Sequence, residues 1–303
     1  MPALRERYQG ALLGLACGDA VGTTVEFSAR GSFSPLTDMI GGGPFNLKPG
    51  QWTDDTSMAL CLAESLITKQ AFDPADQMTR YLNWWKWGYL SSTGECFDIG
   101  MTVSAALERF QTSGDPYCGS PAPNTAGNGS LMRLVPAVLF AYPDIKAVLH
   151  YSAASSRTTH GAAEAIECCQ LFGLLLHAAL SGMPRDSWFA NVEFTPYQEK
   201  IRPLRSGAFL NKTEAELVGS GYCVASLEAA LWCFFNTHSF SEAVLRAANL
   251  GDDADTTAAI TGQLAGAYYG VGGIPKPWLQ RLAMGKDIEE MADQLYLLAS
   301  QSP

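Results

Sequence analysis

Small residues recur every four positions in two apolar segments of this 303-residue chain. Near the N-terminus, residues 4–22 place Gly10, Gly14 and Gly18 on one face of an expected helix. Near the C-terminus, the series comprises Ala254, Ala258, Gly262, Gly266 and Gly270. An isolated glycine costs a helix about 1 kcal/mol, so a whole row of small residues implies that another backbone packs closely against it. We therefore expect the second helix to be central and surrounded by other elements.

No segment shows a convincing alternation of apolar and polar residues, and the best strand candidate, residues 189–194, is short and isolated. The other apolar segments have helical length and spacing. They span residues 4–22, 56–68, 100–110, 131–140, 144–152, 162–180, 226–235, 241–248 and 258–269, with a further helix beginning near residue 73. Residues 28–52 and 112–130 are expected loops, and 184–221 an insertion or a set of short helices. We predict an all-α fold with one domain over residues 1–303.

Composition restricts the classes of partner. Charged residues make up only 17% of the chain, which favours a large compact core. A formal charge of −10 without a basic run argues against general nucleic-acid binding.

Two uncharged stretches, residues 168–184 and 258–275, contain glycine and polar residues, so we expect core helices and no membrane span. The eight cysteines include no C-x-x-C pair, which is typical of buried thiols in a reducing compartment. We expect a cytoplasmic monomer with no signal peptide.

An acidic cluster opens the expected C-terminal helix, with three carboxylates and two hydroxyls between Asp252 and Thr257. One aspartate is enough to cap a helix, whereas three within four positions repel one another. A helix N-terminus supplies only about half a positive charge, so a bound cation explains the cluster better. A similar cluster, Thr53-Asp54-Asp55-Thr56, opens another helix. We hypothesise that the two clusters meet in the fold and jointly hold hard metal ions.

A series of motifs, specific in its order and spacing, resembles the ADP-ribosylglycohydrolase family. The matching pieces are residues 14–22 with Glu26, 52–56, 97–100, 127–133, 158–160, 221–222 and 249–257. They extend over most of the chain. Through Phe97-Asp98-Ile99-Gly100, the pattern is most similar to the bacterial branch that contains the dinitrogenase-reductase-activating glycohydrolase.

The resemblance implies a compact orthogonal helical bundle with a two-metal site at helix N-termini, holding two Mg²⁺ or Mn²⁺ ions. By matching positions, the ligands are Thr53, Asp54, Asp55, Asp253, Asp255 and Thr256. Such oxygen ligands suit hard ions and disfavour zinc. Asp252 stands where relatives often have glycine, so we expect it to cap the helix or face solvent.

The resemblance also assigns roles around the metals. Glu26 matches the catalytic acid/base position. Asp98 matches a position beside the site in the bacterial branch, and we assign it to substrate handling, with acid/base work as its alternative role. The residues expected to bind substrate are Gly127, Asn128, Gly129, Ser130, Met132, His160 and Tyr222. Without the resemblance, Gly127–Gly129 is only a turn, His160 a structural histidine and Tyr222 a core aromatic.

The implied activity is metal-dependent hydrolysis of the bond at ribose C1″, which releases ADP-ribose from a protein or a small molecule. Arginine is the expected attachment point. Hydrolysis of an O-linked, nucleobase or small-metabolite adduct is one alternative, and an inactive ADP-ribose-binding or structural protein is another. A two-metal phosphohydrolase is disfavoured because the sequence has neither a P-loop nor a His-Asp ligand pair.

Overall fold

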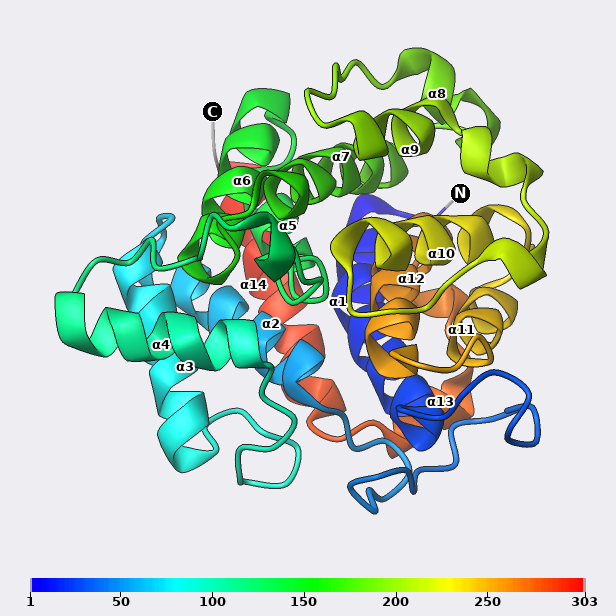
Figure 1. The fold of residues 1–303 in the computed structure, drawn as a ribbon, viewed down its shortest axis with the longest axis horizontal. Helices are drawn as coiled ribbons and strands as arrows, with labels where there is room; N and C mark the ends of the chain where they lie inside the picture. The colour runs from blue at the N-terminus through cyan, green and yellow to red at the C-terminus, as the bar shows by residue number, and fades with distance from the viewer. Residues whose placement is uncertain (1, 302–303) are drawn as a thin grey trace.

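The computed structural model describes residues 2–301, which form helices and loops without a β-sheet (Figure 1). The predicted all-α fold is confirmed. The strand candidate at residues 189–194 is instead part of the one-turn helix α8 (Trp188–Asn191) and the loop after it. Residues 1, 302 and 303 lie outside the described residues, so the single domain over 1–303 stays a prediction at these ends.

The two rows of small residues pack against each other. Helices α1 (Leu4–Gly22) and α12 (Ala254–Tyr269) come from opposite ends of the chain and lie side by side in Figure 1. They run antiparallel, with Gly14 facing Gly262 and Gly18 facing Ala258. A Cβ atom on Gly14 would overlap the carbonyl oxygen of Gly262. The glycines therefore allow the two backbones to touch, as we predicted from the rows of small residues.

Other helices surround this pair. Helices α7 (Ala163–Leu180), α10 (Cys223–Phe235) and α11 (Phe240–Ala248) pack on α12, and α14 (Gly285–Gln301) packs on α1. The remaining α-helices of the described residues, apart from α8, are α2 (Asp54–Lys69), α3 (Pro74–Trp87), α4 (Met101–Ser113), α5 (Val135–Ala141), α6 (Ile145–Thr159), α9 (Arg202–Ser206) and α13 (Lys276–Arg281). All but the final turn of α12, from Ala254 to Ala267, is buried, so the helix is central, as expected.

Several element boundaries differ from the expected ones. Helix α5 begins at Val135 rather than near residue 131, because the chain from residue 128 forms consecutive turns. Helix α6 continues to Thr159 rather than 152, and in its added turns the hydroxyls of Ser156 and Thr158 donate to the carbonyls of His160 and Ser155. Helices α13 and α14 were not predicted. The segment 184–221 contains only short helices, one of the two expected forms.

Helix α7 is long and apolar enough to cross a membrane, but 72% of it is buried inside the protein. It packs against α6, α10 and α12, and it therefore serves as a core helix in this structure. The eight cysteines are all free thiols, and all except Cys96 are buried. The burial of most cysteines is as expected, and it raises the pKa of the Cys169 thiol to about 12.

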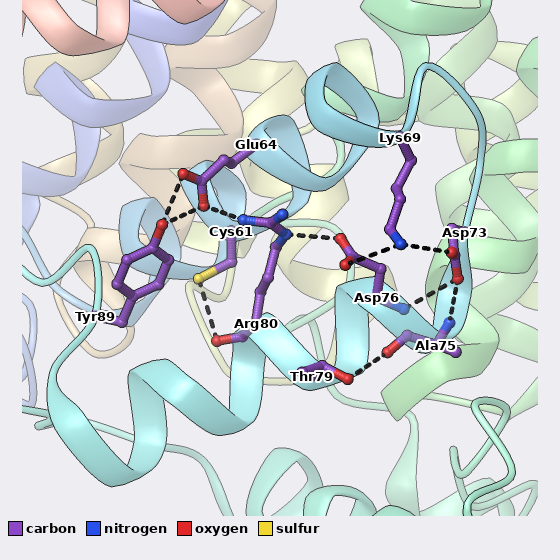
Figure 2. A network of polar contacts seen from close by, with 9 residues as sticks. All are labelled: Cys61, Glu64, Lys69, Asp73, Ala75, Asp76, Thr79, Arg80 and Tyr89. Carbon is purple, nitrogen blue, oxygen red and sulfur yellow. Dashed lines mark hydrogen bonds and ion pairs between the residues drawn. The ribbon is translucent and has the colours of Figure 1, made fainter.

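A polar network fixes α2 against α3 (Figure 2). The Nε atom of Arg80 on α3 donates to Asp76 at 2.7 Å, while its guanidinium also pairs with Glu64 on α2. The hydroxyl of Tyr89 donates to the same Glu64 carboxylate at 2.6 Å. Asp73 caps α3 by accepting from the amide of Asp76 at 3.0 Å. These bonds hold the body of α2, the helix whose first turn carries one acidic cluster.

We expect Gly14→Ala to lower the free energy of unfolding by about 1–3 kcal/mol, because the new methyl group overpacks the contact with α12. Alanine is a better helix former than glycine, so any destabilisation comes from the steric overlap between α1 and α12. Gly272→Ala is the control, since a Cβ there meets nothing within 4 Å. Thermal or urea unfolding measures both variants, and equal stability of the two would contradict the packing argument.

Candidate metal and substrate-binding site

The first turns of α2 and α12 meet at one point, as hypothesised for the two acidic clusters. The hydroxyl of Thr53 lies 3.2 Å from a carboxylate oxygen of Asp55 and 3.2 Å from one of Asp255. Carboxylate oxygens of Asp19, Asp55 and Asp255 all lie within 4.8 Å of one another. Three buried carboxylates from three helices therefore face one another.

Asp19, on α1, is a member of this cluster that the sequence analysis did not assign. Its carboxylate accepts from the backbone amides of Thr53 at 2.9 Å and Thr56 at 3.0 Å. It also accepts from both threonine hydroxyls, at 3.0 and 2.6 Å. Asp19 thus caps α2 from a different helix. Burial raises the pKa of its carboxyl to about 6, although these hydrogen bonds oppose the shift.

The donor set fits a hard divalent cation. The Oδ1 atom of Asp55 is buried without a hydrogen-bond partner among the described residues, and an orphaned carboxylate oxygen needs a positive partner. Burial, followed by the charges of Asp255 and Asp19, raises the pKa of Asp55 well above its usual value. Carboxylate and hydroxyl oxygens are the ligands that Mg²⁺, Mn²⁺ and Ca²⁺ prefer. A bound cation would stabilise the ionised form of each of these acids.

A cavity of about 650 Å³ opens beside the acidic cluster. Its wall includes eleven of the predicted residues: Glu26, Asp54, Asp98, Gly127, Asn128, Gly129, Met132, His160, Asp253, Asp255 and Thr256. Asn128 is tied to Asp253, because its side-chain amide donates to that carboxylate at 2.6 Å. The turn expected to bind substrate is thereby joined to the acidic cluster. None of the residues that line the cavity is a lysine or an arginine.

Four predicted residues do not line the cavity. Thr53 and Asp55 are fully buried behind it, in the cluster with Asp255. Ser130 is also buried, and its hydroxyl accepts from Ser156 at 2.9 Å. The hydroxyl of Tyr222 points to Glu164 and Lys200, at 2.5 and 3.1 Å. The structure thus gives Ser130 and Tyr222 partners within the protein, and their contact with substrate remains a prediction.

Burial raises the pKa values of two carboxylic acids in the cavity wall. Burial, followed by the charges of Asp255 and Asp98, raises the pKa of Glu26 to about 12. Burial, followed by Asp19, raises the pKa of Asp98 to about 7. Oxygens of Glu26, Asp98 and Asp255 lie within 4.8 Å of one another. The two predicted catalytic residues are therefore adjacent to each other and to the acidic cluster.

The cavity mouth contains backbone in the left-handed region at three residues that are not glycine. Phe27 and Asp98 both have φ of 61°, and Asp252 has φ of 56°. Such conformations cost energy for residues other than glycine, and four more of them, at Asn46, Gln70, Leu90 and Met284, lie away from the cavity. The amide of Phe27 donates to the carbonyl of Asp252 at 2.7 Å, and the amide of Asp252 to the carbonyl of Ser28 at 2.8 Å. Asp252 itself is exposed, and solvent exposure is one of the two outcomes that we expected for it.

Comparison with known proteins decides the family. The family model described as ADP-ribosylglycohydrolase matches residues 1–303. The chain belongs to the ADP-ribosylglycohydrolase family. This membership confirms the resemblance drawn from the motifs, and it makes the chain a hydrolase by family.

Relatives and a solved structure extend over nearly the whole chain of this family member. The ADP-ribosylarginine hydrolase Tri1 of Pseudomonas putida (strain GB-1) is 44% identical over 98% of this chain and 79% of its own. The ADP-ribosyl-[dinitrogen reductase] glycohydrolase of Rhodospirillum rubrum is 33% identical over 98% of both chains. A solved structure described as "ADP-ribosylglycohydrolase-related protein complex" superposes with a TM-score of 0.85 at 43% identity, covering 98% of this chain and 99% of that one.

We expect Asp55→Asn to weaken divalent-cation binding, because Asp55 carries the carboxylate oxygen without a partner. Substituting a residue that only supports a metal ligand lowers affinity roughly 10–100-fold, and the loss of a ligand should exceed that. Calorimetric titration of Mn²⁺ or Mg²⁺ into metal-free protein measures the affinity. Asp252→Asn is the matched control, since that carboxylate is exposed, and it should bind as the wild type does. Equal affinity in the two variants would remove Asp55 from the ligand set.

We expect the metal-free protein to lose stability as pH rises from about 5 to 8. The folded-state pKa values of Asp19, Asp98 and Glu26 lie above those of the unfolded chain. Their contribution is therefore fully present below pH about 4 and is lost as pH rises through each folded value. Melting temperatures in EDTA at pH 5 and 8 test this, with Mn²⁺ restoring more stability at pH 8. A metal-free protein that is more stable at pH 8 than at pH 5 would contradict the assignment.

Proposed function

We propose that this chain is a divalent-metal-dependent hydrolase that cleaves the bond between ribose C1″ and an arginine guanidinium, with ADP-ribose as product. The observation that carries the proposal is the acidic cavity, where Glu26 and Asp98 stand beside the joined acidic clusters without a lysine or arginine in the wall. A cavity of this charge suits a cationic leaving group. The names of Tri1 and the Rhodospirillum rubrum relative, both ADP-ribosyl hydrolases, support the same reaction.

We propose two Mg²⁺ or Mn²⁺ ions as the cofactor. The residues that would hold them are the predicted set Thr53, Asp54, Asp55, Asp253, Asp255 and Thr256, with Asp19 supporting Thr53 from behind. When bound, such ions orient the ribose hydroxyls, stabilise developing negative charge and lower the pKa of water. The buried Oδ1 of Asp55 and the all-oxygen donor set support this assignment.

Glu26 is the proposed base. It faces the cavity, and it lies close enough to Asp255 for their oxygens to fall in one 4.8 Å cluster. Cations at the cluster would keep its carboxylate ionised, so that it can take a proton from the attacking water as the C1″–N bond breaks. Asp98 is placed to accept hydrogen bonds from the guanidinium, because its carboxylate stands in the same cavity wall.

An aromatic rim favours arginine as the acceptor residue. The ring of Phe27, which follows Glu26, is 68% exposed and lines the cavity. Phe27 contacts Phe45 with ring centroids 6.5 Å apart, and Phe45 contacts Phe97, next to Asp98, at 5.0 Å. Planar guanidinium groups stack on aromatic faces. Of the three rings only Phe27 lines the cavity, and Phe45 and Phe97 pack behind it. Phe27 thus provides a surface for stacking beside two carboxylates that can accept hydrogen bonds.

A second part of the cavity wall is the proposed site for the ADP moiety. The turn at Gly127, Asn128 and Gly129, together with Met132 and His160, faces the cavity. The amides of Gly127 and Asn128 already donate to the carbonyls of Thr125 and Gly221, so the amide of Gly129 is the donor that this turn offers to an anionic oxygen. We further propose a cytoplasmic monomer that acts on an ADP-ribosylated protein or small molecule; the eight free thiols support the reducing compartment.

A panel of ADP-ribosyl adducts of arginine, serine, glutamate and a nucleobase, each with and without Mn²⁺, tests the function. We expect Mn²⁺-dependent release of ADP-ribose, fastest from arginine. Glu26→Gln should lower kcat about 10²–10⁴-fold, the range for a general base. Glu290→Gln, on the exposed face of α14, is the control. An inactive wild-type protein that still binds ADP-ribose would favour the binding-protein alternative.

Asp98→Asn separates binding of the acceptor from the chemical step. We expect it to raise KM for the arginine adduct more than for the serine adduct, since only the guanidinium needs the carboxylate. Steady-state kinetics with both substrates measure the difference. An equal change in kcat for both substrates would instead assign acid/base work to Asp98.

A further inference from the structure

A buried arginine behind the cavity wall connects the Gly127–Gly129 turn to His160. The side chain of Arg133 is fully buried and lies over the ring of Tyr81, 4.9 Å from its centroid. One terminal nitrogen donates to the carbonyl of Gly129 at 2.9 Å, and the other donates to the hydroxyl of Thr159 at 2.7 Å. A single guanidinium thus holds two walls of the cavity.

The hydrogen bond of Thr159 has a defined direction. A guanidinium can only donate, so the Thr159 oxygen is the acceptor in its bond with Arg133. The remaining O–H of Thr159 lies 2.8 Å from Nδ1 of His160, which is its one available acceptor among the described residues. Thr158 differs, because its hydroxyl donates back to the Ser155 carbonyl at 2.8 Å.

The alternative arrangement is unfavourable. If His160 carried its proton on Nδ1, the Thr159 oxygen would accept from both Arg133 and His160, and its own buried O–H would have no acceptor. Leaving a buried donor unpaired costs about 1–3 kcal/mol. Burial, followed by the charge of Arg133, lowers the pKa of His160 to about 3, so the ring is neutral and carries one proton.

The other ring nitrogen faces the cavity. Nε2 of His160 makes no hydrogen bond with any residue between 2 and 301, and His160 belongs to the cavity wall. The two glycines of the turn leave space for this edge of the ring. An added Cβ would lie 3.3 Å from Nε2 at Gly127 and 3.1 Å from it at Gly129.

We propose that Thr159, anchored by Arg133, is a positioning residue that holds His160 as the Nε2–H tautomer and so makes it a neutral hydrogen-bond donor to an acceptor oxygen of the substrate. The ligand part of this inference rests on the proposed function, which supplies the diphosphate and ribose oxygens of ADP-ribose. The tautomer itself depends only on the contacts among Arg133, Thr159 and His160. A neutral donor binds anionic oxygen without adding a positive charge beside the acidic cluster.

Long-range ¹H–¹⁵N correlation spectra of the ¹⁵N-labelled full-length protein report the tautomer of each of its four histidines, and His160→Gln assigns the signal. We expect Nε2–H in the wild type and in Thr159→Ser, which keeps the hydroxyl. Thr159→Val keeps the shape but removes the donor, and it should shift His160 toward the Nδ1–H form. ADP-ribose affinity, measured by calorimetry with Mn²⁺, should fall about tenfold in Thr159→Val, as expected for one hydrogen bond, and stay near wild type in Thr159→Ser.

An Nδ1–H signal for His160 in the wild type would overturn the proposal without any variant, even if Thr159→Val does not fold. An unchanged tautomer in folded Thr159→Val would overturn the role of Thr159. A shifted tautomer with unchanged ADP-ribose affinity would overturn the contact with substrate. A wild-type protein that does not bind ADP-ribose would instead refute the proposed function, while the spectra still decide the role of Thr159.

Discussion

The close contact between α1 and α12 determines where the acidic site forms. Because the helices run antiparallel, the last turn of α1 meets the first turn of α12, with Gly22 against Ala254 and Gly18 against Ala258. Asp19 and Asp255 each follow one of these contact residues directly, and their carboxylates fall in one cluster. A wider separation of the two backbones, as larger side chains would require, would move these carboxylates apart. The glycine rows thus set the geometry of the site as well as the packing of the core.

The same arrangement stores unfavourable electrostatic energy. Burying several carboxylates together opposes folding, because each ionised group loses hydration and repels the others. Part of this cost is offset by hydrogen bonds, as when Asp19 accepts two amides and two hydroxyls at the start of α2. Asp55 has an oxygen that no described residue satisfies. A cation bound at such a cluster would offset this cost and raise the stability of the fold, which would link stability to function.

The sequence predicted local features well and non-local ones poorly. Rows of glycine and clusters of aspartate are visible within one segment, so α1, α12 and both halves of the acidic cluster could be identified. Asp19 was missed as a cap because it satisfies the amides of Thr53 and Thr56 from a distant helix, whereas cap rules consider only residues next to the helix end. The partners of Tyr222 were missed for the same reason, since Glu164 and Lys200 belong to separate segments. Helix α14 was not predicted, although Ile288, Ala292 and Leu295, which are buried, recur at helical spacing along its apolar face.

The placement of Arg133 shows how one buried cation can coexist with an acidic site. A carboxylate partner would satisfy the guanidinium directly, but pairing with an acid such as Asp253 would remove a negative charge that the proposed metals need. The oxygen atoms that bind Arg133 belong instead to the backbone of Gly129 and Ser155 and to the hydroxyls of Thr158 and Thr159. These neutral acceptors bind its two terminal nitrogens while leaving the carboxylates available, and its Nε has no partner among the described residues. The result is a buried positive charge, which adds to the larger effect of burial in lowering the pKa of His160 to about 3 and so keeps a neutral ring at the cavity wall.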